Sequence, residues 1–156
     1  MDHATMVKVK LYLDSSVPSA YFDSRAPDRQ RLTQQFWKDR LPDSDAVISA
    51  VVLKEIADTP DPTRRQKIEE LVTGMTLLPL TEEATALAQE YVRQRIFPEQ
   101  YESDALHVAI AVVNGVGYLA SWNFKHLVNV RTRREVNLVN ALRGYQPIEI
   151  VAPPEL

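Results

Sequence analysis

Short strand-like segments alternate with longer helical segments along the chain, and this alternation limits the fold more than any other feature of the sequence. Apolar residues at every second position from Val7 to Leu13 predict a strand. Parallel strands are joined by crossovers that are usually helices, so the alternation predicts an α/β fold of three layers, with helices on both faces of a central, mostly parallel sheet. Further strands are expected at residues 46–48, 76–80, 118–121 and 148–151, with longer helices at residues 28–41, 63–72, 81–95, 105–114 and 132–142 and shorter ones after Ser15 and Ser49.

The length and composition fit one domain, which we place over residues 1–156. Cysteine is absent, which excludes disulfides and Cys-ligated zinc or iron–sulfur sites and favours a reducing cytoplasm. No apolar run approaches the roughly 18 residues of a membrane span, and the first residues lack a signal-peptide pattern, so we expect a cytoplasmic protein without membrane contact. The formal net charge of -3 means that nucleic-acid binding would need local basic patches, bound cations or a partner.

Four polar residues lie near the junctions where predicted strands end and helices begin. Asp14 directly follows the first strand, and Glu55 lies about two turns into the helix after the second. Asp104 is in the first turn of the most apolar helix, and Asn123 comes two residues after the strand at 118–121. Ligands of open α/β sheets bind at the carboxyl ends of the strands. We therefore predict that these side chains converge on one edge of the sheet.

Each of the four residues also fits an ordinary structural role. Asp104 favours a helix N-terminus through the macrodipole, and Glu55 fits a solvated helix position. Asp14 and Asn123 are common turn residues. The apolar segments around Asp14 and Asp104 favour a site, because unpaired carboxylates are costly there unless a cation binds them.

Three clustered carboxylates predict a site for Mg²⁺ or Mn²⁺, since hard divalent cations prefer oxygen ligands and relieve the repulsion between the acids. Such a site supports phosphodiester hydrolysis, in which the ion activates water and stabilises the reacting oxygens. Asp14 and Asp104 are expected to be direct ligands. Glu55 is expected to bind the ion directly or through water, or to orient the nucleophile.

These segments resemble the successive motifs of PIN-domain ribonucleases, and within that superfamily they are most similar to the VapC-like toxins of bacterial type II toxin–antitoxin pairs. The resemblance runs from about Leu11 to Ile150, nearly the whole chain. It rests on the order and spacing of the segments at residues 11–16, 103–109 and 121–126, together with Glu55.

The resemblance implies an α/β/α PIN fold, metal-dependent endoribonuclease activity on RNA, homodimers and inhibition by a small antitoxin protein. Asp14, Glu55 and Asp104 match the three core acids of the family. At the fourth site position many members carry an acid, whereas this chain carries Asn123, which brings no charge.

Two other functions were compared with the ribonuclease. A catalytically attenuated PIN-like module that binds RNA or protein is favoured by Asn123. A haloacid-dehalogenase-type phosphatase is set aside because its chemistry needs a second Asp two residues after the first, where this chain has Ser16.

Several further residues have two interpretations. His107 shares a helix face with Asp104, and we expect packing or a structural hydrogen bond for it rather than contact with the site. Aromatic residues able to stack RNA bases are Tyr12, Tyr101, Trp122 and Phe124, of which Trp122 and Phe124 are expected to be core anchors. Two basic clusters are present: we expect residues 64–67 to be a solvated helix start and residues 131–134 to lie nearer the site.

Overall fold

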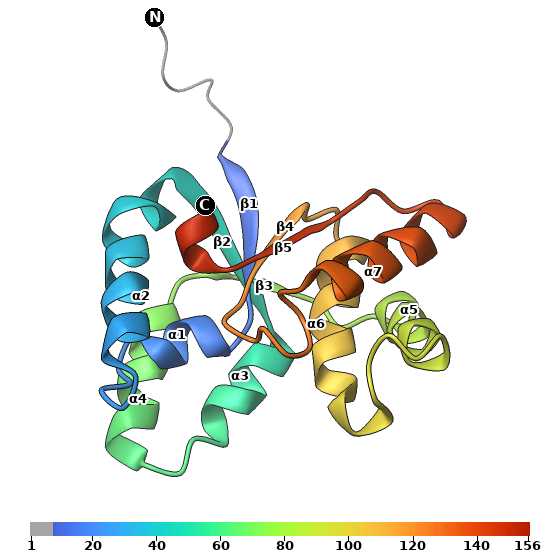
Figure 1. Ribbon diagram of the computed structural model, residues 1–156. Helices are drawn as coiled ribbons and strands as arrows, with labels where there is room; N and C mark the ends of the chain where they lie inside the picture. The colour runs from blue at the N-terminus through green and yellow to red at the C-terminus, as the bar shows by residue number, and fades with distance from the viewer. Residues whose placement is uncertain (1–7) are drawn as a thin grey trace, which may run out of the picture.

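A five-stranded parallel sheet forms the centre of the protein in the computed structural model, which describes residues 8–156 (Figure 1). The strands are β1 (Val9–Leu13), β2 (Ser44–Ser49), β3 (Thr76–Leu78), β4 (Tyr118–Ala120) and β5 (Glu149–Val151), in the order β3-β2-β1-β4-β5. All neighbouring strands in this sheet are parallel. The predicted α/β class with a parallel sheet is confirmed, while Val7, the predicted start of the first strand, lies outside the described residues.

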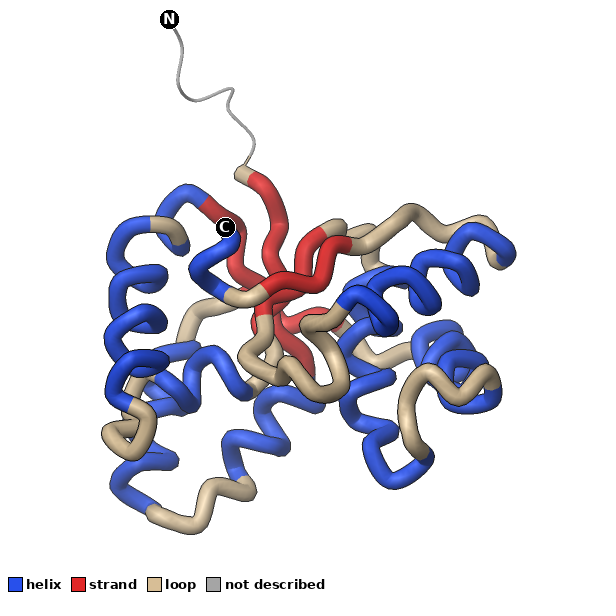
Figure 2. The backbone as a smooth tube through the Cα atoms, in the orientation of Figure 1, coloured by secondary structure: helices blue, strands red, loops and turns tan. Residues whose placement is uncertain are grey.

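Helices fill the connections between the strands and surround the sheet (Figure 2). They are α1 (Ser16–Ala20), α2 (Pro27–Asp39), α3 (Ala50–Ala57), α4 (Pro62–Val72), α5 (Glu82–Arg93), α6 (Glu102–Val113) and α7 (Val130–Leu142). Figure 1 shows α1, α2 and α4 on one side of the sheet and α5, α6 and α7 on the other, which gives the three layers. Within residues 8–156, none of these helices has the length and apolarity that crossing a bilayer requires.

The direction in which strands are added to the sheet reverses at β1. The chain builds β2 and β3 on one side of β1 and then places β4 and β5 on the other side. Right-handed crossovers in opposite directions put their helices on opposite faces of the sheet, which explains the two helical layers. Folds with such a reversal bind their ligands beyond the carboxyl ends of the strands at that point, which here are β1 and β4.

The two central elements of the core are β1 and α6. Leu11 and Leu13 of β1 are at most 2% exposed, and the α6 residues from His107 to Ile110 are at most 1% exposed. The apolar composition of residues 105–114 predicted this burial, and the prediction is confirmed. Because both elements are held by the core, the residues at the end of β1 and in the first turn of α6 have fixed positions.

Helix α7 starts two residues before the expected helix of residues 132–142. The side chain of Asn129 accepts a hydrogen bond from the backbone N–H of Thr132 at 2.8 Å, so Asn129 is the N-cap and the helix begins at Val130. The hydroxyl of Thr132 donates instead to the carbonyl of His126 at 3.0 Å. The predicted start at residue 132 is therefore two residues late, because Asn129 supplies the N-cap acceptor.

Helix α6 ends in a Schellman motif that depends on Gly115. The N–H of Val116 donates to the carbonyl of Ala111 at 2.9 Å, and the N–H of Gly115 donates to the carbonyl of Val112 at 3.0 Å. Gly115 has a φ of 72°, a left-handed conformation that glycine adopts without a steric penalty. This turn directs the chain from α6 into β4.

We expect Gly115→Ala to destabilise the protein by about 1 to 2 kcal/mol, because a Cβ is unfavourable in the left-handed region. A Cβ at Gly115 would meet no atom within 4 Å, so the cost is conformational rather than steric. Gly117→Ala is the matched control, since Gly117 also has open space and does not have a positive φ. Urea unfolding of both variants measures the difference; equal effects would contradict the assignment.

Candidate functional site

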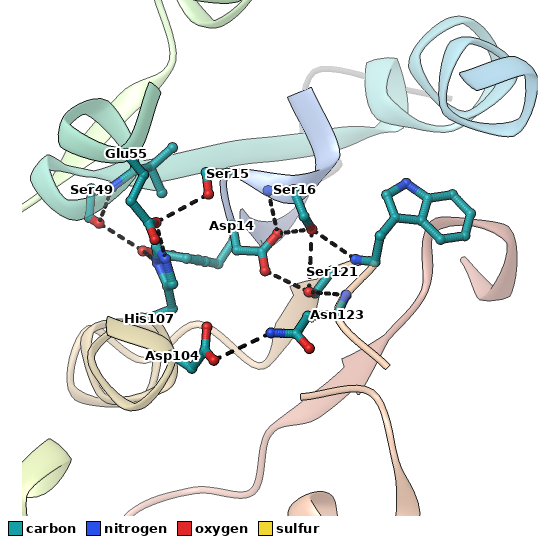
Figure 3. A network of polar contacts seen from close by, with 12 residues as sticks. Asp14, Ser15, Ser16, Ser49, Glu55, Asp104, His107, Ser121 and Asn123 are labelled. Carbon is teal, nitrogen blue, oxygen red and sulfur yellow. Dashed lines mark hydrogen bonds and ion pairs between the residues drawn. The ribbon is translucent and has the colours of Figure 1, made fainter. Parts of the chain in front are cut away.

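The predicted site residues come together at the carboxyl ends of β1 and β4 (Figure 3). Asp14 follows β1 directly, and Asn123 lies three residues after the end of β4. Asp104 is in the first turn of α6, and Glu55 is in the second turn of α3. Figure 3 shows the four side chains close together, with hydrogen bonds that link Asp14, Asn123 and Asp104 and a second set that links Glu55 to His107. The structure therefore brings together residues that are far apart in the sequence.

Asp14 joins the segments that follow the two central strands. It is 4% exposed, and its Oδ1 accepts hydrogen bonds from the hydroxyl and the backbone N–H of Ser16 at 2.5 and 3.1 Å. Its Oδ2 accepts from the hydroxyl of Ser121 at 2.5 Å. The two hydroxyls in turn accept backbone N–H groups from Trp122 and Asn123, each at 2.9 Å. The buried carboxylate thus orders the loop after β4.

Burial makes the two aspartates harder to ionise. Burial raises the pKa of Asp14, although the positive charge of His107 and the serine hydrogen bonds oppose the shift. Burial also raises the pKa of Asp104 to about 6; His107 opposes this increase, whereas the charge of Asp14 adds to it. Both carboxylates are therefore in an environment that a positive ion would stabilise.

His107 contacts the site directly, which the sequence analysis did not expect. Its Nε2 lies 2.6 Å from Oε1 of Glu55, and its Nδ1 lies 2.7 Å from the hydroxyl of Tyr12. Tyr12 continues the network to the hydroxyl of Ser49 at 2.7 Å. Ser15 donates to the same Glu55 oxygen at 3.1 Å. The expected structural hydrogen bond of His107 is thus present, but its partner is a site carboxylate.

His107 and Glu55 stabilise each other's charged forms. Burial disfavours a charged His107, but the hydrogen bond and negative charge of Glu55 outweigh burial and raise the histidine pKa. Burial likewise opposes ionisation of Glu55, but the hydrogen bond and charge of His107 lower its pKa. The ionised pair is therefore the form that these contacts stabilise.

Tyr12 cannot stack an RNA base, because it is 0% exposed. That expectation was wrong, and the reason is that Tyr12 belongs to the central strand of the sheet. A buried tyrosine hydroxyl and a histidine in an apolar helix both need hydrogen-bond partners, so the sequence does signal that Tyr12 and His107 must be paired. It does not indicate that they are paired with each other across 95 residues.

Asn123 has a fixed amide orientation. Its Oδ1 accepts the backbone N–H of His126 at 2.9 Å, and a backbone N–H can only donate, so the oxygen must be on that side. Its Nδ2 then faces Asp104 and donates to Oδ2 at 3.3 Å. Asn123 thus supplies a neutral hydrogen-bond donor to Asp104.

The donor set fits a hard divalent cation in its chemistry. Among residues 8–156, no three acidic or histidine side chains are close enough to hold a metal ion as they stand. However, Asp14, Glu55 and Asp104 offer only oxygen ligands, which Mg²⁺ and Mn²⁺ prefer. Asp104 receives one hydrogen bond from the described residues, on Oδ2, which leaves Oδ1 for an ion. The coordination of a metal by these three residues stays a prediction.

We expect Asp104→Asn to stabilise the metal-free protein at about pH 7.5 but not at about pH 4. The folded pKa of about 6 exceeds the ordinary aspartate pKa of 3.8, so ionisation costs stability only as the pH rises through this window. A shift of about two units corresponds to at most about 3 kcal/mol. Urea unfolding in EDTA measures the effect, with the exposed Asp39→Asn as control. A gain that is independent of pH would contradict the shift.

Comparison with known proteins gives a family for the chain and relatives for its fold. The family model for the PIN domain matches residues 11–121, which include Asp14, Glu55 and Asp104. No curated protein matches the chain significantly.

Two solved structures are similar at low sequence identity. The crystal structure of VapC20 from Mycobacterium tuberculosis, a sarcin-ricin loop cleaving toxin, has a TM-score of 0.58 at 14% identity and covers 88% of this chain and 98% of its own. VapBC2 from Rickettsia felis, bound to a DNA fragment from the promoter, has a TM-score of 0.52 at 14% identity, covering 75% of this chain and 90% of that chain. The fold neighbours are thus toxins of VapBC systems, and because the family model matches more than half of the sequence, the chain belongs to the PIN domain family.

Proposed function

We propose that this PIN domain is a Mg²⁺- or Mn²⁺-dependent endoribonuclease that hydrolyses RNA phosphodiester bonds. The observation that carries the proposal is the placement of Asp14, Glu55 and Asp104 at the same edge of the sheet, beyond the carboxyl ends of β1 and β4. The raised pKa values of Asp14 and Asp104 support it, because both carboxylates are held where a bound cation would stabilise them.

The roles of the residues follow from their hydrogen bonds. Asp14, Glu55 and Asp104 would hold the ion, which when bound activates water and stabilises charge on the phosphate oxygens. Ser16 and Ser121 orient the carboxylate of Asp14, and His107 orients that of Glu55. Asn123 donates to Asp104 and limits the rotation of its carboxylate. Such contacts behind the ligands are what commonly orients the carboxylates of a metal site.

We further propose that the chain is the toxin of a type II toxin–antitoxin pair, acting as a homodimer and inhibited by a small antitoxin protein. Support comes from the two similar structures, one of a VapC toxin and one of a VapBC complex. Co-expression with the product of a short neighbouring gene, followed by size-exclusion chromatography, tests both the partner and the dimer. A monomer that forms no complex would contradict this part of the proposal.

We expect the protein to cleave labelled RNA in Mg²⁺ or Mn²⁺ and to lose cleavage in EDTA and in the Asp14→Asn and Asp104→Asn variants. Each substitution removes a negative charge that an ion needs. The RNA panel contains single strands and a sarcin-ricin loop, the RNA that the similar VapC20 cleaves. Asp39→Asn, an exposed change of the same kind, is expected to cleave normally. Full cleavage by Asp104→Asn would show that the site is assigned wrongly.

The alternative is a catalytically attenuated module that binds RNA or protein, and the neutral Asn123 favours it. The Asn123→Asp variant distinguishes an active endoribonuclease from an attenuated binding module. We expect no gain in cleavage rate at saturating Mg²⁺, because the change replaces the donor to Asp104 by a like charge. An increase of more than about tenfold would show that the missing acid limits catalysis and would favour attenuation.

A further inference from the structure

A groove with a volume of about 390 Å³ lies beside the loop of residues 122–126 that carries Asn123. Three cations line it, and they come from different parts of the chain: Arg95 after α5, Lys125 in the loop and Arg131 in the first turn of α7. Of the residues that the structure describes, no carboxylate belongs to the lining. We call this surface the basic groove. Its charge contrasts with the net charge of -3 of the whole chain.

The basic groove is connected to the acidic site through His126. His126 lines the groove, and its backbone N–H donates to Asn123, whose amide donates to Asp104. Tyr101, three residues before Asp104, packs against the His126 ring at a centroid distance of 4.2 Å. A strand of nucleic acid with one phosphate at the carboxylates would therefore have its neighbouring phosphates beside this groove.

Arg95 has a backbone conformation that argues for a role of its side chain. Helix α5 ends in the same Schellman motif as α6, with hydrogen bonds from Arg95 N–H to the Val92 carbonyl and from Ile96 N–H to the Tyr91 carbonyl. The position that Gly115 takes in α6 is taken here by Arg95, with a φ of 60°. It is the sole non-glycine residue with positive φ in residues 8–156. Glycine would be more stable at this position, so the guanidinium is retained at a cost to the fold.

Two of the three cations of the basic groove are free to bind a ligand. Within the described part of the chain, the side chains of Arg95 and Lys125 form no ion pair or hydrogen bond, whereas Arg131 has an exposed ion pair with Glu135 at 3.5 Å and donates to the carbonyl of Arg95 at 3.3 Å. Phe124, on the wall of the groove, is 49% exposed and not the core anchor that was expected. Proteins bind single-stranded nucleic acids through this arrangement, in which an exposed aromatic ring stacks a base and the neighbouring cations contact phosphates.

A second cavity, of about 350 Å³, borders Asn123 on the side of α2 and α4 and is less suited to phosphates. Its guanidiniums already have partners. Arg25 binds Asp23 through two hydrogen bonds, and Arg29 lies over the Trp122 ring at 5.2 Å. Arg64 donates to the Ser19 carbonyl and is 25% exposed, so it is not the solvated residue that the sequence suggested.

We propose that the basic groove binds the backbone phosphates of single-stranded RNA next to the scissile bond, with Phe124 stacking a base. This inference rests on the proposed function, because it assumes that the strand passes over the carboxylates. In this proposal, the basic groove holds the nucleotides that flank the reacting phosphate.

The test is binding of a fluorescein-labelled, random-sequence RNA 12-mer to the full chain carrying Asp104→Asn in Mg²⁺, followed by fluorescence anisotropy over a salt series. The Lys125→Gln/Arg131→Gln double variant is expected to bind at least about tenfold more weakly at low salt. The slope of log K against log salt is expected to decrease by about 0.7 for each phosphate that is no longer neutralised. Phe124→Ala is expected to weaken binding on the order of tenfold with an unchanged slope.

Two further double variants serve as controls, because each removes the same number of positive charges as Lys125→Gln/Arg131→Gln. Arg31→Gln/Lys38→Gln alters exposed positions of α2 outside both cavities and is expected to leave binding unchanged. Arg25→Gln/Arg64→Gln alters the second cavity. Equal losses in all three pairs would show a bulk charge effect, and a loss confined to Arg25→Gln/Arg64→Gln would place the RNA in the other cavity. Either result overturns the proposal.

Arg95→Gly separates binding from folding. It is expected to raise the urea midpoint, since glycine suits the left-handed position, while it weakens RNA binding. A lower midpoint, or unchanged binding, would contradict the role of Arg95. If the unmutated chain cleaves no RNA but the groove variants lose binding, the nuclease assignment fails and the groove stands. If cleavage is normal and binding is unchanged in the groove variants, or if the 12-mer does not bind at all, the groove assignment fails.

Discussion

The buried carboxylate of Asp14 is the constraint on which the rest of the site depends. A charge at this position, beyond the end of a central strand, must be compensated by hydrogen bonds or by an ion. Ser16 and Ser121 supply those bonds from the two sides of the point where the sheet changes direction. Their hydroxyls then hold the backbone after β4, which sets the position of Asn123. A single charged group thus connects the topology of the sheet with the geometry of the site.

The remaining charges of the site are distributed so that each is only partly compensated within the protein. Glu55 is paired with His107, and its pKa is lowered. Among the described residues, Asp104 is hydrogen-bonded by the neutral donor Asn123, and burial keeps its pKa at about 6. The fold therefore places one paired and one poorly paired carboxylate next to each other. Functional sites commonly retain such unfavourable electrostatics, because the unmet charge is what attracts the ligand.

Much of this arrangement could be predicted from the sequence, since periodicity and strand ends are local properties. The period-two segment before Asp14 and the apolar helix after Asp104 placed both acids at the correct edge of the sheet. Strand order could not be predicted, because it depends on packing between distant segments. The pairing of Tyr12 with His107 could not be predicted either, because the two residues are 95 positions apart in the sequence. The exposure of Phe124 was also missed: a single aromatic residue in a loop looks the same whether it faces the core or the solvent.

His107 is connected to α3 at two points, with a consequence for that helix as a whole. One ring nitrogen binds Glu55 in the second turn, and the other reaches the N-cap Ser49 through the hydroxyl of Tyr12. Rotation of α3 about its own axis, or sliding along that axis, would break both connections at once. The direction of the Glu55 carboxylate therefore depends on how α3 is positioned against α6, and not on the side-chain torsion angles of Glu55 alone.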